Sequence, residues 1–169
     1  MTLPFRILTV CFALMLSAPA SAQEVRVLGT FGKWVAQTYL ENGQPVCFMS
    51  VKPDSSEGNY KARGEALLMV TNRASEAMDV ISVVAGYQYL PDSDAVVTVN
   101  GKRFNLFTNG ERAWARDTQT DKTIVQLLIK GRSVTVRGTS SRNNVTTDIY
   151  SLTGFTAAHQ AITENCKKV

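Results

Sequence analysis

Cysteines, a histidine and acidic side chains are the groups in this 169-residue chain that could carry chemistry. Of its three cysteines, Cys11 lies in an apolar N-terminal leader, whereas Cys47 and Cys166 stand near the two ends of the remaining chain. Two cysteines in an exported chain allow one intramolecular pairing. A bridge from Cys47 to Cys166 closes a loop of about 120 residues, for which the chain-entropy model gives about 5 kcal/mol. The sequence therefore favours a structural disulfide over the alternative, a reactive or intermolecular thiol.

His159 is the one histidine of the chain. A catalytic triad built on it needs a positioned nucleophile, and the sequence contains no G-x-S-x-G. A zinc site needs three or four His, Cys or acidic ligands, and both remaining cysteines are assigned to the bridge. The sequence thus indicates no catalytic residue, no metal site and no cofactor, and it favours an exposed or capping role for His159.

Acidic residues leave a second chemistry open, because paired carboxylates can hydrolyse glycosidic bonds. Asp92 and Asp94 flank Ser93 just after Pro91, where a turn is the simpler interpretation. Asp148 is a third acid that could converge with them only in three dimensions. The glycines form no G-x-G-x-x-G or G-x-x-x-x-G-K-[ST] phosphate loop. A carboxylate-based hydrolase therefore stands as the alternative to a protein without catalytic residues.

The N-terminal 22 residues have the three parts of a secretory signal peptide. Arg6 is the only charge before Glu24, residues 7–16 form a ten-residue apolar run, and Ala20-Ser21-Ala22 supplies the small-x-small cleavage pattern. A membrane span needs about 20 apolar residues, so this run is short for an anchor. We predict a signal peptide over residues 1–22 and one exported domain over residues 23–169.

Charge places few limits on the partners of the domain. The formal net charge of +4 falls to +3 when Arg6 leaves with the leader. Basic residues are interspersed with acids, as in the stretch from Lys61 to Glu65, where local pairing is expected. No run of like charges and no basic-aromatic stripe indicates nucleic-acid binding. No later segment approaches membrane-spanning length, so the mature chain is not expected to span a membrane.

Most of the chain has the period-two pattern of β-strands, and two segments break it. Asn42-Gly43 and Asn100-Gly101 favour tight hairpin turns, while residues 52–63 are polar and predict a surface loop. The predicted strands are 31–40, 46–51, 65–71, 78–85, 96–99, 103–107, 133–137 and 147–152, the last two joined by a loop over 138–145.

Two short helices complete the expected fold. Asp121 is positioned to cap the first, and Gly131 follows it where a left-handed residue often ends a helix. The second spans residues 155–166. Their apolar stripes are Ile124, Leu127 and Leu128 in the first, and Phe155, Ala158, Ile162 and Cys166 in the second. The sequence predicts a mainly β (α+β), antiparallel, β-sandwich-like single domain whose last helix is C-terminal.

Loops, strand edges and tryptophans are the features of this chain that could form a partner surface. Trp34 and Trp114 could mark a ligand surface, although core or core-edge positions are more usual for tryptophan in a small β domain. The 138–145 loop presents Arg142, Asn143 and Asn144. We therefore name Arg142, Asn143, Asn144 and Trp114 as the candidate partner surface.

Two stretches of the C-terminal third carry a resemblance to a known family. Residues 134–142 (VTVRGTSSR) and 147–155 (TDIYSLTGF) resemble the invasion-associated locus B family of exported bacterial proteins. The likeness extends over roughly residues 31–166. The features that fit are Trp34 before Cys47, Gly86-Tyr87 before Pro91, the 99–104 and 113–115 segments, and the final Cys166. Asn143-Asn144 departs from the glycine-containing turn expected of the family.

The resemblance implies a periplasmic or secreted protein of a Gram-negative bacterium, and the family takes its name from a locus associated with entry into host red blood cells. It transfers no catalytic residues. We therefore expect a non-enzymatic envelope or host-interaction protein that acts by binding an as yet unidentified partner. The alternative is the small periplasmic hydrolase with a carboxylate-based site.

Overall fold

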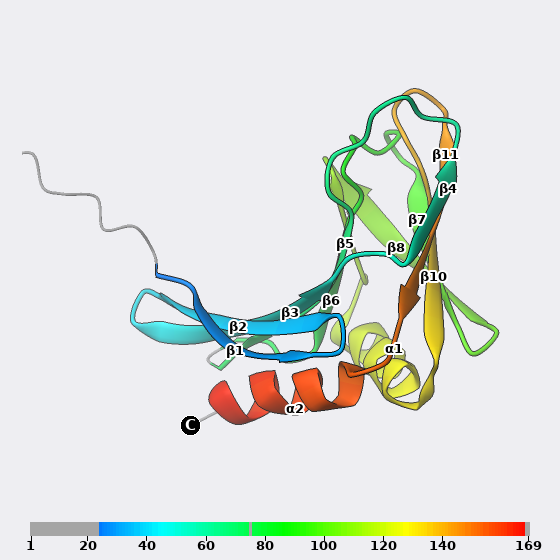
Figure 1. The fold of residues 1–169 in the computed structure, drawn as a ribbon. Helices are drawn as coiled ribbons and strands as arrows, with labels where there is room; N and C mark the ends of the chain where they lie inside the picture. The colour runs from blue at the N-terminus through cyan, green and yellow to red at the C-terminus, as the bar shows by residue number, and fades with distance from the viewer. Residues whose placement is uncertain (1–23, 75, 168–169) are drawn as a thin grey trace, which may run out of the picture.

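A computed structural model describes residues 24–74 and 76–167 of the chain. The predicted signal peptide, residues 1–22, lies outside the described residues. Eleven strands form one antiparallel sheet in the order β1-β2-β3-β5-β6-β9-β8-β7-β10-β11-β4, accompanied by two helices (Figure 1). The mainly β fold with a C-terminal helix is confirmed, and its strands hydrogen-bond as a single continuous sheet.

The elements have the following bounds. The strands are β1 (Arg26–Phe31), β2 (Trp34–Glu41), β3 (Gln44–Val51), β4 (Ser55–Gly58), β5 (Leu67–Arg73), β6 (Val80–Val84), β7 (Asp94–Val99), β8 (Lys102–Asn109), β9 (Arg112–Trp114), β10 (Ser133–Thr139) and β11 (Val145–Ser151). The helices are α1 (Thr118–Lys130) and α2 (Phe155–Asn165).

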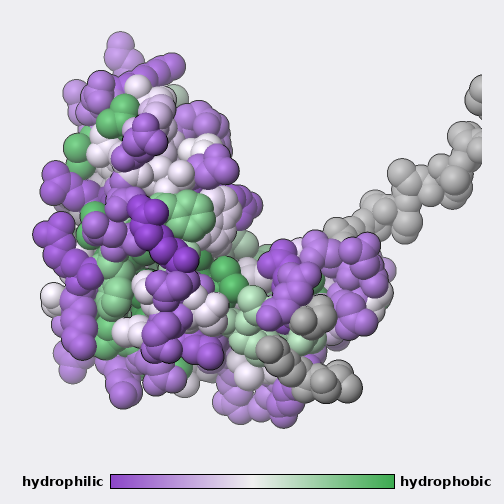
Figure 2. All heavy atoms as spheres, turned by 180° about the vertical axis from the view of Figure 1, so that it is seen from behind, coloured by the Kyte–Doolittle hydropathy of each residue, from purple (hydrophilic) through white to green (hydrophobic). Residues whose placement is uncertain are grey.

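The sheet bends so that its two halves are steeply inclined to each other (Figure 1). One half holds β1, β2, β3, β5 and β6, with α2 packed against its outer face, and the upright half holds β7, β10, β11 and β4. Helix α1 lies near the corner and contacts β6, β7 and α2. Seen from behind, hydrophobic side chains are visible where the two halves meet, whereas the free end of the lower half is hydrophilic (Figure 2).

Both predicted Asn-Gly hairpin turns are confirmed. Asn42 and Gly43 have φ of 51° and 78°, and Asn100 and Gly101 have φ of 49° and 75°. A two-residue turn with positive φ at both positions matches the twist of antiparallel strands, and asparagine and glycine adopt it at low cost. These turns fix the registers of β2 with β3 and of β7 with β8.

Several predicted boundaries were wrong, two of them at the edge strands β1 and β4. The expected 52–63 loop contains β4, whose four residues are all exposed and whose pairing with β11 stabilises them. The 31–40 strand is divided by a turn at Gly32-Lys33, which leaves β1 as a separate edge strand. The 138–145 loop is shorter than expected, since Gly138 and Thr139 pair within β10.

The start of the first helix also differs from the prediction. Asp117 is the N-cap of α1, and its carboxylate accepts a 2.8 Å hydrogen bond from the Thr120 amide. Asp121 is instead buried in the first turn, where it accepts 2.9 Å from the Ile81 amide of β6. Gly131 is extended (φ −88°, ψ 170°) rather than left-handed. A Cβ at Gly131 would lie 2.8 Å from Leu152, so close packing explains this glycine.

Asp121 is expected to make stability depend on pH. Burial raises the pKa of Asp121 to about 6 from its ordinary 3.8, although the Ile81 amide opposes the rise. A raised carboxyl pKa contributes stability that is complete below about pH 4 and lost as pH rises through 6. In urea titrations, the free energy of unfolding of Asp121→Asn should rise relative to that of the wild type by on the order of 2 kcal/mol between pH 4 and pH 7. A difference that stays constant with pH would contradict this assignment.

Helix α2 closes the outer face of the lower half-sheet. Trp34 is completely buried beneath it, with its ring 5.0 Å from that of Phe155 and its indole N–H donating 3.0 Å to the Ser151 carbonyl. Trp34 is therefore a core residue, as favoured from the sequence. The end of α2 is tied back to β3 by the disulfide between Cys47 and Cys166, whose Cα atoms are 5.9 Å apart.

Candidate functional site

A polar cleft opens at the end of the upright half-sheet, beside the β10–β11 turn. Its volume is about 630 Å³, and its walls come from three chain segments, within 59–63, 87–88 and 140–146. The first segment follows β4 and the last leads into β11, so the β4–β11 pairing brings together residues more than 80 positions apart (Figure 1). The missed strand β4 is thus what builds the cleft.

A buried ion pair lies at the base of the polar cleft. Both terminal nitrogens of Arg63 donate 2.7 Å hydrogen bonds to the two carboxylate oxygens of Asp148, and Nε donates 2.6 Å to the Ala85 carbonyl. The two side chains are only 6% and 3% exposed. Burial alone would lower the pKa of Arg63, but the bonds and charge of Asp148 outweigh it and raise that pKa. Arg63 is therefore held in one position at the base of the cleft, and its charge is neutralised by Asp148.

Tyrosine rings hold this ion pair in place. The Arg63 guanidinium lies 5.0 Å from the ring centroid of Tyr87 and 5.6 Å from that of Tyr60, within cation–π range. The Tyr87 hydroxyl is 2.7 Å from the Thr146 hydroxyl, and burial raises the pKa of Tyr87. A Cβ at Gly138 would lie 2.7 Å from the Tyr87 hydroxyl, which explains a glycine inside β10. The base of the cleft is consequently rigid.

The rim of the polar cleft differs from its base in having unused hydrogen-bonding capacity. Five polar side chains line the cleft and bond to no other described residue. They are Asn59, Lys61, Ser141, Arg142 and Asn144. Two of the predicted partner-surface residues, Arg142 and Asn144, are among them, so the structure places both at one site.

The other two members of the predicted surface lie elsewhere. Asn143 is at the exposed tip of the β10–β11 turn, with φ of 60°, and does not line the cleft. Trp114 is half-buried in β9, where its ring stacks on Phe107 at 5.7 Å. The four residues predicted as a partner surface therefore do not line one cleft.

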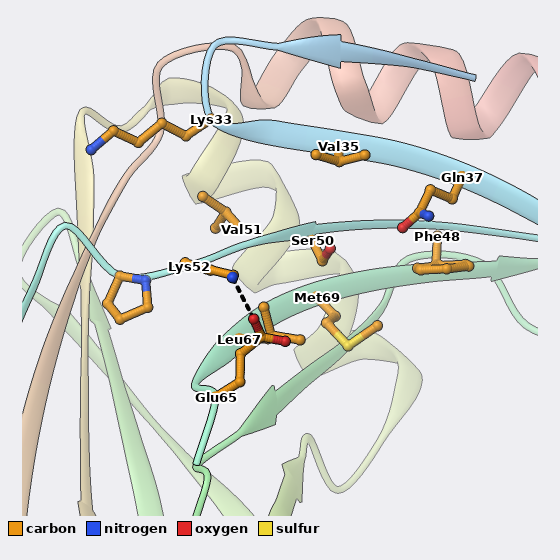
Figure 3. Close-up of a pocket in the computed structure, with 11 residues that line it drawn as sticks. Lys33, Val35, Gln37, Phe48, Ser50, Val51, Lys52, Glu65, Leu67 and Met69 are labelled. Atoms are coloured by element: carbon orange, nitrogen blue, oxygen red, sulfur yellow. Dashed lines mark ion pairs between the residues drawn. The ribbon is translucent and has the colours of Figure 1, made fainter. Parts of the chain in front are cut away.

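A second concavity, the apolar groove, lies on the face of the lower half-sheet that is turned away from α2 (Figure 3). Its volume is about 620 Å³. Its floor consists of Val35, Gln37, Phe48, Ser50, Leu67 and Met69. Cross-strand pairing continues this face from Met69 through Ser82 to Trp114, so Trp114 belongs to the groove side of the sheet. At one end, the ion pair of Lys52 with Glu65 borders the groove.

None of the three acids considered for hydrolysis lines either of the two concavities. No carboxylate or histidine lines the described polar cleft, and the apolar groove has only Glu65, which is paired with Lys52. Asp148 is engaged by Arg63, and Asp94, at the start of β7 rather than in the turn, pairs with Arg116 at 2.6 Å. The expected pairing within the 61–65 stretch was wrong, because Arg63 and Glu65 each have a distant partner.

His159 is neither exposed nor a cap, contrary to expectation. Its Nε2 lies 2.7 Å from a carboxylate oxygen of Asp79, and its ring stacks on Phe155 at 6.0 Å. Asp79, at φ 64°, also donates its amide to the Asn72 side chain at 2.7 Å. His159 therefore joins α2 to the turn before β6 in a structural role.

Residues 24–74 and 76–167, the part of the chain that the structure describes, lack two kinds of feature. No cluster of three His, Cys, Asp or Glu side chains in this part of the chain could hold a metal ion. None of its helices has the length and apolar character needed to cross a membrane.

The fold and the cleft define a disulfide-closed, antiparallel β protein with a solvent-open polar site over a buried ion pair. The chain belongs to the Invasion associated locus B (IalB) protein family, whose model matches residues 34–163. This confirms the family resemblance. The family is one of exported bacterial proteins, with which the disulfide agrees. Comparisons with curated proteins and with solved structures give no match.

Proposed function

We propose that the protein is a non-enzymatic, extracytoplasmic binding protein of the bacterial envelope and that the polar cleft is its binding site. The observation that carries this proposal is the set of five rim side chains that bond to no other described residue and lie above a rigid base. Such side chains can form hydrogen bonds to a ligand, and each bond contributes to the free energy of binding. A rigid base lowers the entropic cost of binding, because it is already ordered in the free protein. Family membership supports an envelope role associated with invasion.

The hydrolase alternative has less support. General acid–base catalysis needs a positioned group that titrates near the working pH, most often histidine or a carboxylate. The polar cleft is lined by neither, and the one acid at its base is held in a bidentate ion pair with Arg63. Binding is therefore the function that this geometry favours.

Photo-crosslinking in intact bacteria tests the proposal. A diazirine-bearing amino acid replaces Ser141 in the cleft or, as the matched control, exposed Lys122 on α1. After irradiation, the purified protein is analysed by intact mass and peptide mapping. We expect an adduct of defined mass at position 141 and none at position 122. Equal labelling at both positions, or no adduct at 141, would refute the cleft as the binding site of an envelope ligand.

A further inference from the structure

The polar cleft carries an uncompensated positive charge. Three cations line it, but Arg63 is neutralised by Asp148, so Lys61 and Arg142 supply the remaining charge. Both are exposed and neither forms an ion pair with a described residue. They lie on different walls, one on the segment after β4 and one on the β10–β11 turn. Because a concave wall concentrates the field of its charges, the cleft should attract an anionic group.

The neutral groups of the rim narrow the chemistry of the ligand. Asn59, Ser141 and Asn144 carry amide and hydroxyl groups, each of which can both donate and accept hydrogen bonds. A simple anion needs donors alone, whereas sugar hydroxyls both donate and accept. Tyr60, which remains 36% exposed, adds an aromatic surface. The electron-rich face of such a ring attracts the weakly positive C–H groups of a sugar.

The size and composition of the cleft fit a saccharide better than a polypeptide. A volume of about 630 Å³ is within the range of small-ligand sites, about 300–1,000 Å³. Peptides are bound mainly by strand addition or by apolar pockets for anchor side chains. Most residues that line the polar cleft instead have amide, hydroxyl or cationic side chains, and none is a large aliphatic residue.

We propose that the cleft recognises an acidic saccharide, a sugar bearing a carboxylate, sulfate or phosphate group. Lys61 and Arg142 would hold the acidic group from two sides, and the amides of Asn59 and Asn144 would bond to hydroxyls. The inference rests on the proposed function, since it names the ligand class of the same cleft. Bacterial envelopes and animal cell surfaces both supply such sugars, and the chemistry required of the cleft is the same.

Calorimetric titration of the mature protein tests this inference. The probes are tetragalacturonate, which carries the uronic acid found in bacterial envelopes, a sulfated heparin tetrasaccharide of the animal type, neutral maltotetraose, and tetraglutamate. We expect at least one acidic saccharide to bind, more weakly as salt increases, and both maltotetraose and tetraglutamate to bind at least tenfold more weakly. The acidic saccharide that binds more tightly indicates whether the ligand comes from the bacterial envelope or from an animal cell surface.

Single variants identify the site. Lys61→Gln and Arg142→Gln should each weaken binding of the acidic saccharide by about tenfold, because each removes a charged hydrogen bond. Lys122→Gln on α1, also an exposed lysine, should leave it unchanged. Comparable binding of maltotetraose or tetraglutamate, variants that match the control, or no saccharide binding at all would overturn the inference. An adduct at position 141 without saccharide binding would leave the proposed function standing and eliminate only this ligand class.

Discussion

Asp148→Ala is expected to lower the free energy of unfolding by about 3–5 kcal/mol, because it leaves the Arg63 charge without its partner in a buried site. Both guanidinium bonds to the carboxylate would be lost, and the Arg63 side chain is only 6% exposed. Water cannot readily replace the carboxylate, because the Asp148 side chain is only 3% exposed and the rings of Tyr60 and Tyr87 pack against the guanidinium of Arg63. Urea denaturation followed by tryptophan fluorescence measures the loss.

An exposed ion pair serves as the control, because breaking it shows how much stability is lost when the pair is not buried. Asp54→Ala breaks the ion pair with Lys33, whose side chains are 36% and 65% exposed, and should cost about 0–1 kcal/mol. Replacing both buried partners, Arg63→Met with Asp148→Leu, should recover much of the loss, since no buried charge remains. A cost for Asp148→Ala as small as that for Asp54→Ala would show that the buried pair is not what stabilises the base of the cleft.

The sequence was most informative where structure is decided locally. The Asn-Gly pairs at 42–43 and 100–101 specify a backbone conformation within two residues, so both hairpins could be predicted. The apolar spacing of α2 likewise identifies its buried side, which includes Phe155, Ala158 and Ile162. These elements need no knowledge of their tertiary partners.

The cap of α1 shows where local reasoning fails. Asp117 and Asp121 are both acids near the start of the helix, and propensity alone does not separate them. Asp121 does not cap the helix, because its carboxylate accepts a hydrogen bond from the buried amide of Ile81, 40 residues away in sequence. The competition is decided by a tertiary contact.

The candidate site was only partly predictable for the same reason. Arg142 and Asn144 could be named because they lie in one polar turn. Lys61 and Arg63 could not, because the strand that places them, β4, is entirely exposed and has no alternating pattern. One signal was available: the period of two along β11 puts Asp148 on the same side as Thr146 and Tyr150, both buried, which indicates a buried charge in need of a partner.

Removing the disulfide is the other change with a large expected effect. The double variant Cys47→Ala with Cys166→Ala should have a free energy of unfolding lower by about 2–5 kcal/mol. The chain-entropy model gives about 5 kcal/mol for a loop of this length. The bridge spans 119 positions, so it restricts most of the unfolded chain. Both cysteines are fully buried, and alanine avoids placing a new polar group there. Against a total stability of about 5–15 kcal/mol, the loss would be substantial.

Reductant separates the effect of the bridge from the effect of packing. Wild-type protein unfolded in urea with dithiothreitol should approach the stability of the double alanine variant, which should itself be indifferent to the reductant. Thiol labelling of the denatured mature chain should find none without reductant and two with it, since Cys11 leaves with the predicted leader. If reduction left the wild-type midpoint unchanged, the bridge would not be what holds the end of α2 to β3. The stability of the domain would then depend on the packing of α2 against the sheet alone.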